Sequence, residues 1–414
     1  MRLAVVTPFI DRQHGTERAL AELLDRLTRD YACEIHLYAE RVADLAVTVP
    51  NGAARTHKSG VPSTGSITWH RVPPIPGPHL FKFIFWIIAN TTIRWWHRIA
   101  RGLRPDLVLS PGINCLNADF VIVHALFHRL QELSREQSTK ESASKSQSAG
   151  ALRGLHRRAY YSTVAALERI VYTNRKTHLA AVSRRTAALL QKYFERKDVS
   201  VIYNGIDTLQ FSLPARLALR QGARFRRKFS EEELVLLLIG NDWRVKGLPA
   251  VLEAMAALRE LPLRLIIVGS DDAVGFQRSA QQLGIADRCR WEPPRPDVID
   301  FFAAADVYVS PTREDSFGLP VAEAMACGLP AITSKSAGVS ELIQNDRDGL
   351  ILTDPPDATA LATLLRNLHT DPALRTNLGA AAAITAQTWT WDRNATAIWQ
   401  WLQSTKQDRQ SQSR

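Results

Sequence analysis

The chain has 414 residues, 45% of them hydrophobic, and a formal net charge of +11. This length is too great for one ordinary hydrophobic core and favours two domains. The four cysteines are scattered without metal-ligand spacing, which argues against a zinc site or a disulfide framework and indicates buried thiols in a reducing cytosol. The apolar run after Met1 is too short for a secretory signal and predicts a buried first strand.

The first half of the chain alternates short apolar segments with helical stretches, as expected for a parallel sheet with helices on both faces. Leucines recur on one side of a predicted helix at 17–29, which follows the turn that contains Gly15. We expect the strands of this half at 3–6, 34–38, 107–110, 120–124 and 179–183.

A basic stretch without Asp or Glu lies between Asp44 and Asp106. Its centre, residues 80–98, combines apolar aromatic residues with Lys and Arg, but its unbroken apolar run is well short of the roughly 20 residues that span a bilayer. Two interpretations stay open: a helix lying in the headgroup layer of an anionic membrane, or an ordinary helix that covers the sheet. Nucleic acid is disfavoured as a partner because no recognised binding motif accompanies the charge.

Two histidines follow the strand at 120–124. Either His124, the better candidate, or His128 could contact a substrate, although a histidine at a strand end is as often structural. The next segment, 131–150, is rich in Ser, Lys, Glu and Gln and predicts a mobile loop. Helical character returns at 151–172, and Ser183 is expected to cap a further helix.

The strand at 201–203 runs into the turn Asn204-Gly205-Ile206-Asp207, where we place the domain boundary. The first domain is expected to span 1–203 and to be completed by a helix within 390–414, and the second to span 204–389. The second domain alternates again. Its expected strands are 235–240, 263–269, 289–291, 307–310 and 331–333, and its expected helices are 249–258, 276–283 and 298–304.

Two cations, Arg244 and Lys246, lie in the segment Gly240–Gly247, which follows a strand and opens a helix. Cations at this place can neutralise a diphosphate whose negative charge grows as it leaves. Arg grips oxygens with a planar fork, whereas Lys acts as a point charge. Taken alone, the segment is equally typical of a solvated basic turn.

The segment 311–330 carries the most information. Gly318 allows a tight turn, and Pro320 suits the first turn of a helix. The N–H groups of Phe317, Gly318 and Leu319 then lie at the positive end of a helix dipole, which is a ready phosphate site. Asp315 and Glu323 bracket this turn, together with Ser316, and carboxylates are good acceptors for sugar hydroxyls. A phosphate site flanked by hydroxyl acceptors indicates a nucleotide-sugar.

These residues resemble the donor site of retaining glycosyltransferases of family 4, which have the GT-B fold. The family pattern is Glu, seven residues, Glu, with Phe-Gly-Leu after the first acid. Here Asp315 takes the place of the first Glu, and Glu314 is one residue too early. The segment around Arg244 and Lys246 also resembles the family, most closely its lipopolysaccharide-core and exopolysaccharide branch, and Asn204–Asp207 matches a recurrent turn.

The resemblance implies two Rossmann-like domains facing across a cleft, with a C-terminal helix that crosses back to the first domain. It implies that Arg244 and Lys246 hold the diphosphate and that Glu323 accepts the ribose hydroxyls. The sugar would be held by Asp315 and by the segment Ser316–Leu319. Gly15 would lie near the donor phosphates, although the family has a glycine pair where this chain has His14-Gly15. His124 would contact the transferred sugar or orient the acceptor.

The expected function is therefore transfer of a hexose from a nucleotide-diphosphate sugar to a saccharide or lipid-linked acceptor of the cell envelope. No cofactor and no metal are expected, because cations and a helix N-terminus hold the diphosphate. The enzyme would be cytoplasmic, on or near the inner face of the membrane. Two alternatives remain: a nucleotide-sugar epimerase of the same fold, and a non-catalytic basic protein that binds membrane or nucleic acid.

Overall fold

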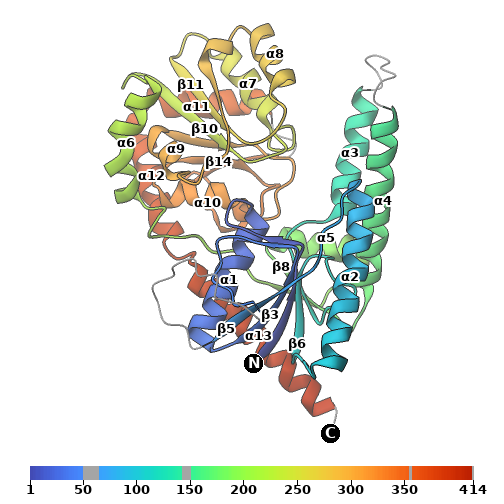
Figure 1. The fold of residues 1–414 in the computed structure, drawn as a ribbon. Helices are drawn as coiled ribbons and strands as arrows, with labels where there is room; N and C mark the ends of the chain where they lie inside the picture. Colours follow the sequence, from blue (N-terminus) through green and yellow to red (C-terminus); the bar gives the residue numbers. More distant parts are fainter. Residues whose placement is uncertain (50–64, 142–150, 354–356, 413–414) are drawn as a thin grey trace. The chain divides into compact units, whose positions relative to one another are not determined.

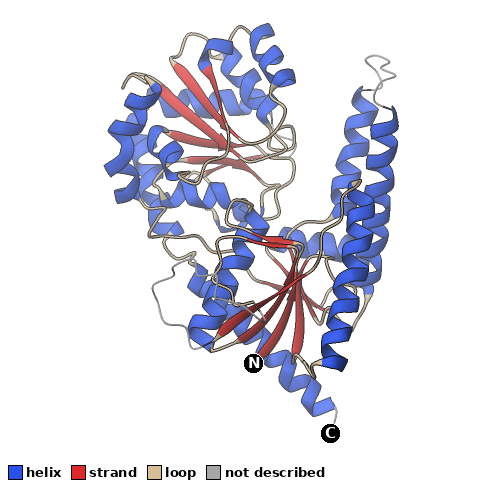
Figure 2. Ribbon diagram, viewed as in Figure 1, coloured by secondary structure: helices blue, strands red, loops and turns tan. Residues whose placement is uncertain are grey.

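The computed structural model describes residues 1–49, 65–141, 151–353 and 357–412. The chain divides into two compact units, residues 1–203 with 394–414, and residues 204–393. Each unit contains a parallel β-sheet with helices on both faces (Figures 1 and 2). The predicted α/β class with two Rossmann-like domains is confirmed. The chain passes back to the first unit at Arg393/Asn394, four residues after the predicted position of 390.

The sheet of the first unit has seven strands in the order β5-β3-β1-β6-β7-β8-β9. The first strand of the chain, β1, lies inside this sheet and pairs in parallel with β3 on one side and with β6 on the other. A short pair, β2 (Phe9–Ile10) and β4 (Arg41–Val42), lies beside it. The strands of the main sheet are β1 (Arg2–Val6), β3 (Glu34–Ala39), β5 (Ser66–Arg71), β6 (Leu107–Pro111), β7 (Phe120–Val123), β8 (His178–Ala181) and β9 (Val199–Val201).

Alternating side chains of this sheet pack on helices of its two faces. One face, which includes Val6 and Val123, forms a core with α2 (His79–Ala100), α4 (Ala151–Thr173) and α5 (Arg184–Phe194). On the other face lie α1 (Gly15–Tyr31) and α13 (Trp391–Gln412) (Figure 1). Ser183 caps α5 by accepting the N–H of Thr186 at 3.1 Å, as predicted.

Helix α13 completes the first unit. The ring of Trp401 packs edge-on against Phe120 of β7, with centroids 4.7 Å apart, and Trp399 stacks on Tyr31 of α1. The side-chain amide of Asn394 donates a hydrogen bond to the carbonyl of Tyr203 at 2.7 Å. These contacts confirm the predicted return of a C-terminal helix to the first domain.

The sheet of the second unit has six strands in the order β12-β11-β10-β13-β14-β15. Helices α7, α8 and α11 cover one face, and α6, α9 and α10 cover the other (Figure 1). The strands are β10 (Leu234–Ile239), β11 (Leu263–Val268), β12 (Cys289–Glu292), β13 (Val307–Ser310), β14 (Ala331–Ser334) and β15 (Leu350–Leu352). The helices are α6 (Leu213–Arg227), α7 (Leu248–Ala257), α8 (Val274–Gln282), α9 (Ile299–Ala304), α10 (Leu319–Ala326), α11 (Ala358–Thr370) and α12 (Pro372–Ala386).

The predicted mobile loop at 131–150 is wrong for its first part. Residues Phe127–Glu141 form helix α3, and residues 142–150 lie outside the described part of the chain. Helix α3 packs on α4, where Gln131 hydrogen-bonds Ser162 at 3.3 Å, and Leu133 is buried. The apolar residues of α3 lie only in its first half, at Phe127, Leu130 and Leu133. Packing of this half on a neighbouring helix accounts for the helix, because tertiary packing supplies most helix stability.

Three buried histidines join the sheet of the first unit to α2. His36 of β3 and His70 of β5 approach with 2.9 Å between Nδ1 and Nε2, and the hydroxyl of Tyr38 lies 3.2 Å from Nδ1 of His97 on α2. Glu34 bonds the outer nitrogen of His36 at 3.1 Å. Burial lowers the pKa of His70 to about 3, and the neighbouring His97 and His36 add to this effect. Burial also lowers the pKa of His36 and of His97.

We expect the first unit to lose stability as the pH falls from about 6.5 towards about 3. The ordinary pKa of 6.5 applies to His70 in the unfolded chain, and its pKa in the folded chain is about 3. The unfolded chain therefore binds the proton more readily in this window, and stability falls by up to about 1.4 kcal/mol for each unit of pH. The urea concentration at the unfolding midpoint should decrease when the pH is lowered from about 7 to about 5. The substitution His70→Phe should make this decrease smaller. An unchanged midpoint would contradict the expectation.

Candidate active site

The predicted donor residues of the second unit lie near the point where the strand order of its sheet reverses. The sheet begins with β10 at its centre and is extended to β11 and β12 on one side and to β13, β14 and β15 on the other. In open parallel sheets, ligands bind at such a switch point, outside the carboxyl ends of the strands. The two loops found there follow β10 and β13. They are residues 240–247 and 311–318, which contain the predicted cations and the first predicted acid.

Backbone geometry fixes the loop that carries Arg244 and Lys246. Gly240 and Gly247 both have positive φ angles, 140° and 84°. A β-carbon on Gly247 would lie 2.2 Å from the carbonyl oxygen of Pro311, so only glycine permits this approach of the two loops. Trp243 is buried beneath the loop, whereas Arg244 is exposed and Lys246 is half-buried.

Asp271, after β11, holds the same loop from the other side. Its carboxylate accepts the backbone N–H of Asp242 at 2.9 Å and of Trp243 at 2.6 Å. In return, the side-chain oxygen of Asn241 accepts the N–H of Ser270 at 2.9 Å. These three bonds fix the loop although Asp242 has a φ of 58°. This role was not predicted from the sequence, because the carboxylate of Asp271 binds only backbone N–H groups of the loop.

We expect Asp271→Asn to weaken binding of a nucleoside diphosphate by about tenfold, although the substitution leaves Lys246 itself unchanged. An amide has a single acceptor oxygen, so one of the two loop N–H groups would lose its partner, at a cost of about 1–3 kcal/mol. Titration calorimetry would measure the affinity. Asp272→Asn is the matched control, because Asp272 accepts the N–H of Val274 and leaves the loop untouched. Equal effects of the two substitutions would contradict the assigned role.

The acidic loop is held by the strand and turn that follow it. The N–H of Asp315 donates to the carbonyl of Ser336 at 3.1 Å, and the N–H of Val339 donates to the carbonyl of Phe317 at 2.6 Å. Phe317 is buried, and Gly318, with a φ of 98°, precedes α10. Pro320 lies in the first turn of α10, as predicted. The first N–H groups of this helix have no partner within the helix, which makes its N-terminus a suitable place for an anion.

The two loops meet. Lys246 forms an ion pair with Asp315, and the N–H of Arg313 donates to the carbonyl of Val245 at 2.7 Å. The hydroxyl of Thr312 donates to the same carbonyl at 3.0 Å. The structure thus brings a predicted diphosphate ligand into contact with a predicted sugar ligand, beside the N-terminus of α10. Sequence reasoning gave the two residues separate roles and did not predict their contact.

Glu323 lies on α10 and is only 3% exposed. Two buried neighbours feel its negative charge. Burial raises the pKa of the Tyr308 phenol and of the Cys327 thiol, and the nearby carboxylate of Glu323 raises both pKa values further. Asp315 acts on Tyr308 in the same direction. The hydroxyl of Tyr308 donates to the carbonyl of Ile239, at the end of β10, at 3.3 Å. Tyr308 therefore lies under the site, close to both acids, and sequence reasoning did not single it out.

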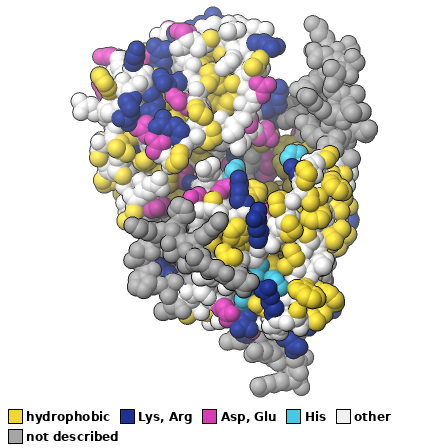
Figure 3. Space-filling model, in the orientation of Figure 1, with side chains coloured by type: hydrophobic (Ala, Val, Ile, Leu, Met, Phe, Trp, Pro, Cys, Tyr) yellow, Lys and Arg dark blue, Asp and Glu magenta, His cyan; other side chains and the backbone are white. Residues whose placement is uncertain are grey.

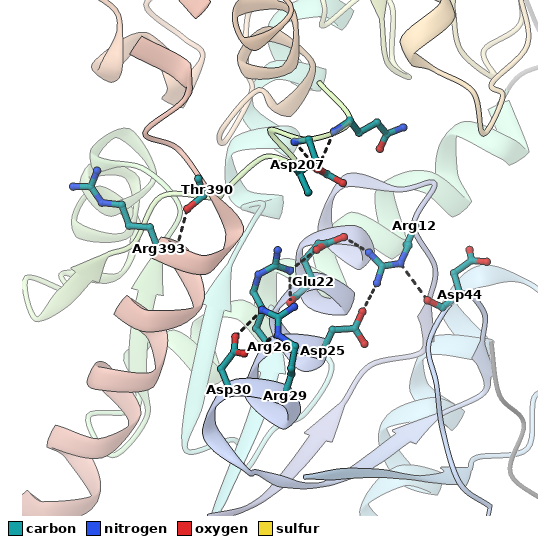
Figure 4. Close-up of polar contacts among 12 residues, drawn as sticks. Arg12, Glu22, Asp25, Arg26, Arg29, Asp30, Asp44, Asp207, Thr390 and Arg393 are labelled. Atoms are coloured by element: carbon teal, nitrogen blue, oxygen red, sulfur yellow. Dashed lines mark hydrogen bonds and ion pairs between the residues drawn. The ribbon is translucent and has the colours of Figure 1, made fainter. Parts of the chain in front are cut away.

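In the first unit, Gly15 begins α1, directly after the predicted turn. Asp11 holds this turn by accepting the N–H groups of Gln13 and His14 at 3.0 and 3.1 Å and by bonding the ring of His14 at 2.9 Å. Burial alone would raise the pKa of Asp11, but the bonds from His14 and the backbone lower it on balance. Arg12 is held in turn by Glu22 and Asp25 of α1 and by the carbonyl of Asp44 at 3.2 Å (Figure 4).

The two candidate histidines differ in their partners. His128 is bound by Glu168 of α4 at 2.7 Å, and the same buried carboxylate accepts the N–H groups of Phe127 and His128 at the start of α3. His128 is thus part of a helix cap. His124 follows β7 and is half-buried, and its Nδ1 has no hydrogen-bond partner among the described residues. Burial lowers its pKa to about 4, so the ring is neutral at pH 7.

The turn at the predicted domain boundary has a structural explanation. Asp207 accepts the N–H groups of Leu209 and Gln210, both at 3.0 Å (Figure 4). A β-carbon on Gly205 would lie 2.3 Å from the backbone nitrogen of Trp391, so a glycine is required where the two chain segments pass. Among the described residues, no group of three His, Cys, Asp or Glu side chains is placed to hold a metal ion.

Two family models match the chain, and together they include every predicted site residue. The model for group 1 glycosyl transferases matches residues 220–385, and the model for glycosyltransferase family 4 matches residues 14–210. The chain belongs to the family 4 glycosyltransferases. The family resemblance drawn from the sequence is therefore confirmed, and the family consists of transferase enzymes.

Relatives of this family 4 glycosyltransferase include the D-inositol 3-phosphate glycosyltransferases of Streptomyces avermitilis, 33% identical over 53% of this chain and 50% of the relative, and of Thermomonospora curvata, 32% identical over 52% and 53%. The chain spans about half the length of these relatives. Among solved structures, WaaG, a glycosyltransferase involved in lipopolysaccharide biosynthesis, aligns over 96% of this chain and 98% of its own, with a TM-score of 0.74 and 19% identity. HepE from Anabaena, in complex with UDP-glucose, aligns over 98% and 100% with a TM-score of 0.68 and 17% identity. These structures share the fold.

Proposed function

We propose that this protein is a retaining, metal-independent hexosyltransferase that moves a sugar from a nucleotide-diphosphate sugar to a saccharide or lipid-linked acceptor. The observation that carries the proposal is the ion pair between Lys246 and Asp315 beside the N-terminus of α10. It joins a cation, a carboxylate and a helix N-terminus at the switch point of one sheet. A nucleotide-sugar has the matching groups, a diphosphate with hydroxyls on either side.

Binding of the donor would change the partner of Lys246. The diphosphate would replace Asp315 at the ammonium group, and the released carboxylate would accept hydroxyls of the sugar. Arg244 and the first N–H groups of α10 would share the phosphate charge, which grows as the bond to the sugar breaks. No side chain is assigned as nucleophile. The leaving phosphate would take the proton of the acceptor hydroxyl on the same face of the sugar, which retains the configuration.

The acceptor is proposed to be lipopolysaccharide core or another envelope glycan, reached from the cytoplasm at the inner face of the membrane. One protein of the same fold, WaaG, is described as involved in lipopolysaccharide biosynthesis. The relatives named D-inositol 3-phosphate glycosyltransferase give a second class of acceptor to include in the test. His124, whose ring is neutral and whose Nδ1 has no hydrogen-bond partner in the described part of the chain, is proposed to contact the transferred sugar.

The test is a thermal-shift screen against uridine and guanosine diphosphate sugars, followed by a transfer assay with the donor that stabilises the protein. Release of nucleoside diphosphate that depends on the acceptor supports transfer. Conversion of the donor to an isomer without an acceptor would instead establish the epimerase. The absence of any shift and any turnover would leave a basic protein that binds membrane or nucleic acid and would refute the proposal.

A further inference from the structure

Helix α2 is apolar on two opposite faces. Its inner face packs on the first unit through Trp86 and Ile87, which are buried, and the indole N–H of Trp86 donates to the carbonyl of Asn114 at 3.1 Å. Near its other end, Arg94 donates to the side chain of Asn117 at 2.7 Å, and His97 joins the histidine cluster described above. These contacts fix the rotation of the helix, so the opposite face remains at the surface.

The outer face of α2 presents large hydrophobic side chains to solvent. Their exposed fractions range from 42% for Ile84 to 61% for Ile99. Six of the thirteen exposed large hydrophobic side chains among the described residues lie on this one helix, and Figure 3 shows hydrophobic side chains gathered along this side of the first unit. The outer face of α2 consists of Phe81, Ile84, Ile88, Trp95, Trp96 and Ile99.

The spacing of these residues makes them a single stripe. Phe81, Ile84, Ile88, Trp95 and Ile99 are three, four, seven and four residues apart, and at 3.6 residues per turn they fall within about a quarter of the helix circumference. Contiguous exposed apolar patches on soluble proteins mark interaction sites.

Cations border the stripe. By the same periodicity, Lys82 and Arg98 lie on opposite sides of it, and both are exposed. No Asp or Glu occurs in the sequence between Asp44 and Asp106. The surface therefore combines an apolar centre, two tryptophans and a positive border. Tryptophan prefers the boundary between lipid and water, and Lys or Arg near an anionic lipid surface each contribute about 1 kcal/mol.

We propose that the outer face of α2 docks the protein on a lipid surface that contains anionic headgroups, with the helix parallel to that surface. Aromatic and aliphatic side chains would enter the boundary of the acyl chains, while Lys82 and Arg98 stay among the headgroups. Among the described residues, no helix is both long and apolar enough to cross a membrane. The inference extends the proposed function, because it rests on an acceptor held at a membrane.

A second copy of the chain fits this surface less well than a membrane does. Two outer faces in contact would place Lys82 and Arg98 of both copies in one interface, and α2 itself contributes no acid that could neutralise them there. Juxtaposed like charges in an interface cost several kcal/mol. An anionic lipid surface supplies the opposite charge along the whole helix.

Flotation of the full chain with vesicles, without donor or acceptor, tests the proposal. We expect binding to vesicles of phosphatidylcholine with phosphatidylglycerol, little binding to phosphatidylcholine alone, and weakening by salt. The triple variant Trp95→Ser, Trp96→Ser, Ile99→Ser should lower binding to the anionic vesicles by at least about tenfold. The double variant Lys82→Ser, Arg98→Ser should remove most of the preference for anionic lipid.

The matched control removes exposed hydrophobic groups elsewhere. Leu217, Leu219 and Phe225 of α6 are also exposed, and their triple replacement by serine should leave vesicle binding unchanged. Circular dichroism and the thermal shift with nucleotide-sugar would establish that each variant is folded. The proposal is overturned if wild type does not float, if both triple variants bind equally, or if α2 instead mediates self-association without lipid binding. Failure of sugar transfer alone would not alter the flotation result, so the two proposals fail separately.

Discussion

Lys246→Ala is expected to lower the turnover of sugar transfer by about a hundredfold or more. Lys246 is the cation that the structure holds at the meeting point of the two loops, paired with Asp315. Removing one charge-stabilising group from a transition state typically costs a factor of about 10²–10³ in turnover. A continuous assay for released nucleoside diphosphate, with saturating donor and acceptor, would measure the change. Lys197→Ala, which removes an exposed lysine of the first unit, is the control.

The partner of Lys246 provides an internal check on this prediction. Asp315→Asn should also lower turnover, because it removes both the counter-charge of the lysine and the proposed hydroxyl acceptor. The double variant should be little worse than the poorer single variant, since residues that act as a unit are not additive. Glu314→Gln should have a small effect, because Glu314 does not take the place of the first acid. Wild-type turnover in Lys246→Ala would remove the site assignment.

Much of the fold was predictable because the strands are buried on both faces and are therefore nearly continuous apolar runs. Segments such as Leu234–Ile239 and Leu263–Val268 can be recognised as strands from their apolar residues alone. Several polar elements were not predicted. Strand β5, Ser66–Arg71, contains Thr, His and Arg, and helix α6 has four arginines in its last eight residues. These elements depend on partners elsewhere in the chain, such as Asp306, which binds Arg220 and Arg224.

The candidate site, like the fold, was predictable only in part. Glycines and charged residues near the donor loops could be recognised because their chemistry is local. The contacts that hold those loops join strand ends far apart in the sequence: Asp271 binds the N–H of Trp243, and Lys246 reaches Asp315. A single sequence contains no direct record of such pairs. His128 illustrates the converse, because its proximity in sequence to His124 gave no indication that buried Glu168 already binds it.

Glu323→Ala is expected to lower turnover by roughly a hundredfold, on the scale of a lost transition-state contact. Its carboxylate is buried on α10, and the charge has to be compensated by hydrogen bonds to persist there. In the proposed complex, the ribose hydroxyls supply such bonds when the donor binds. The same released-nucleotide assay measures the loss, and Glu253→Ala, which removes an exposed acid from α7 in the same unit, should leave turnover unchanged.

Glu323→Gln separates the proposed contact from simple packing. Glutamine keeps the volume of the side chain, so a merely structural Glu323 predicts near-normal turnover and donor KM in this variant, with a loss only in Glu323→Ala, where a cavity forms. A hydroxyl acceptor predicts the opposite: both variants weaken the donor complex, because a neutral amide oxygen is a poorer acceptor than a carboxylate. The donor KM should therefore rise in Glu323→Gln although its thermal unfolding without donor is close to that of wild type. Normal kinetics in Glu323→Gln would exclude the ribose contact and would leave Glu323 as a buried part of the helix that supports the donor loop.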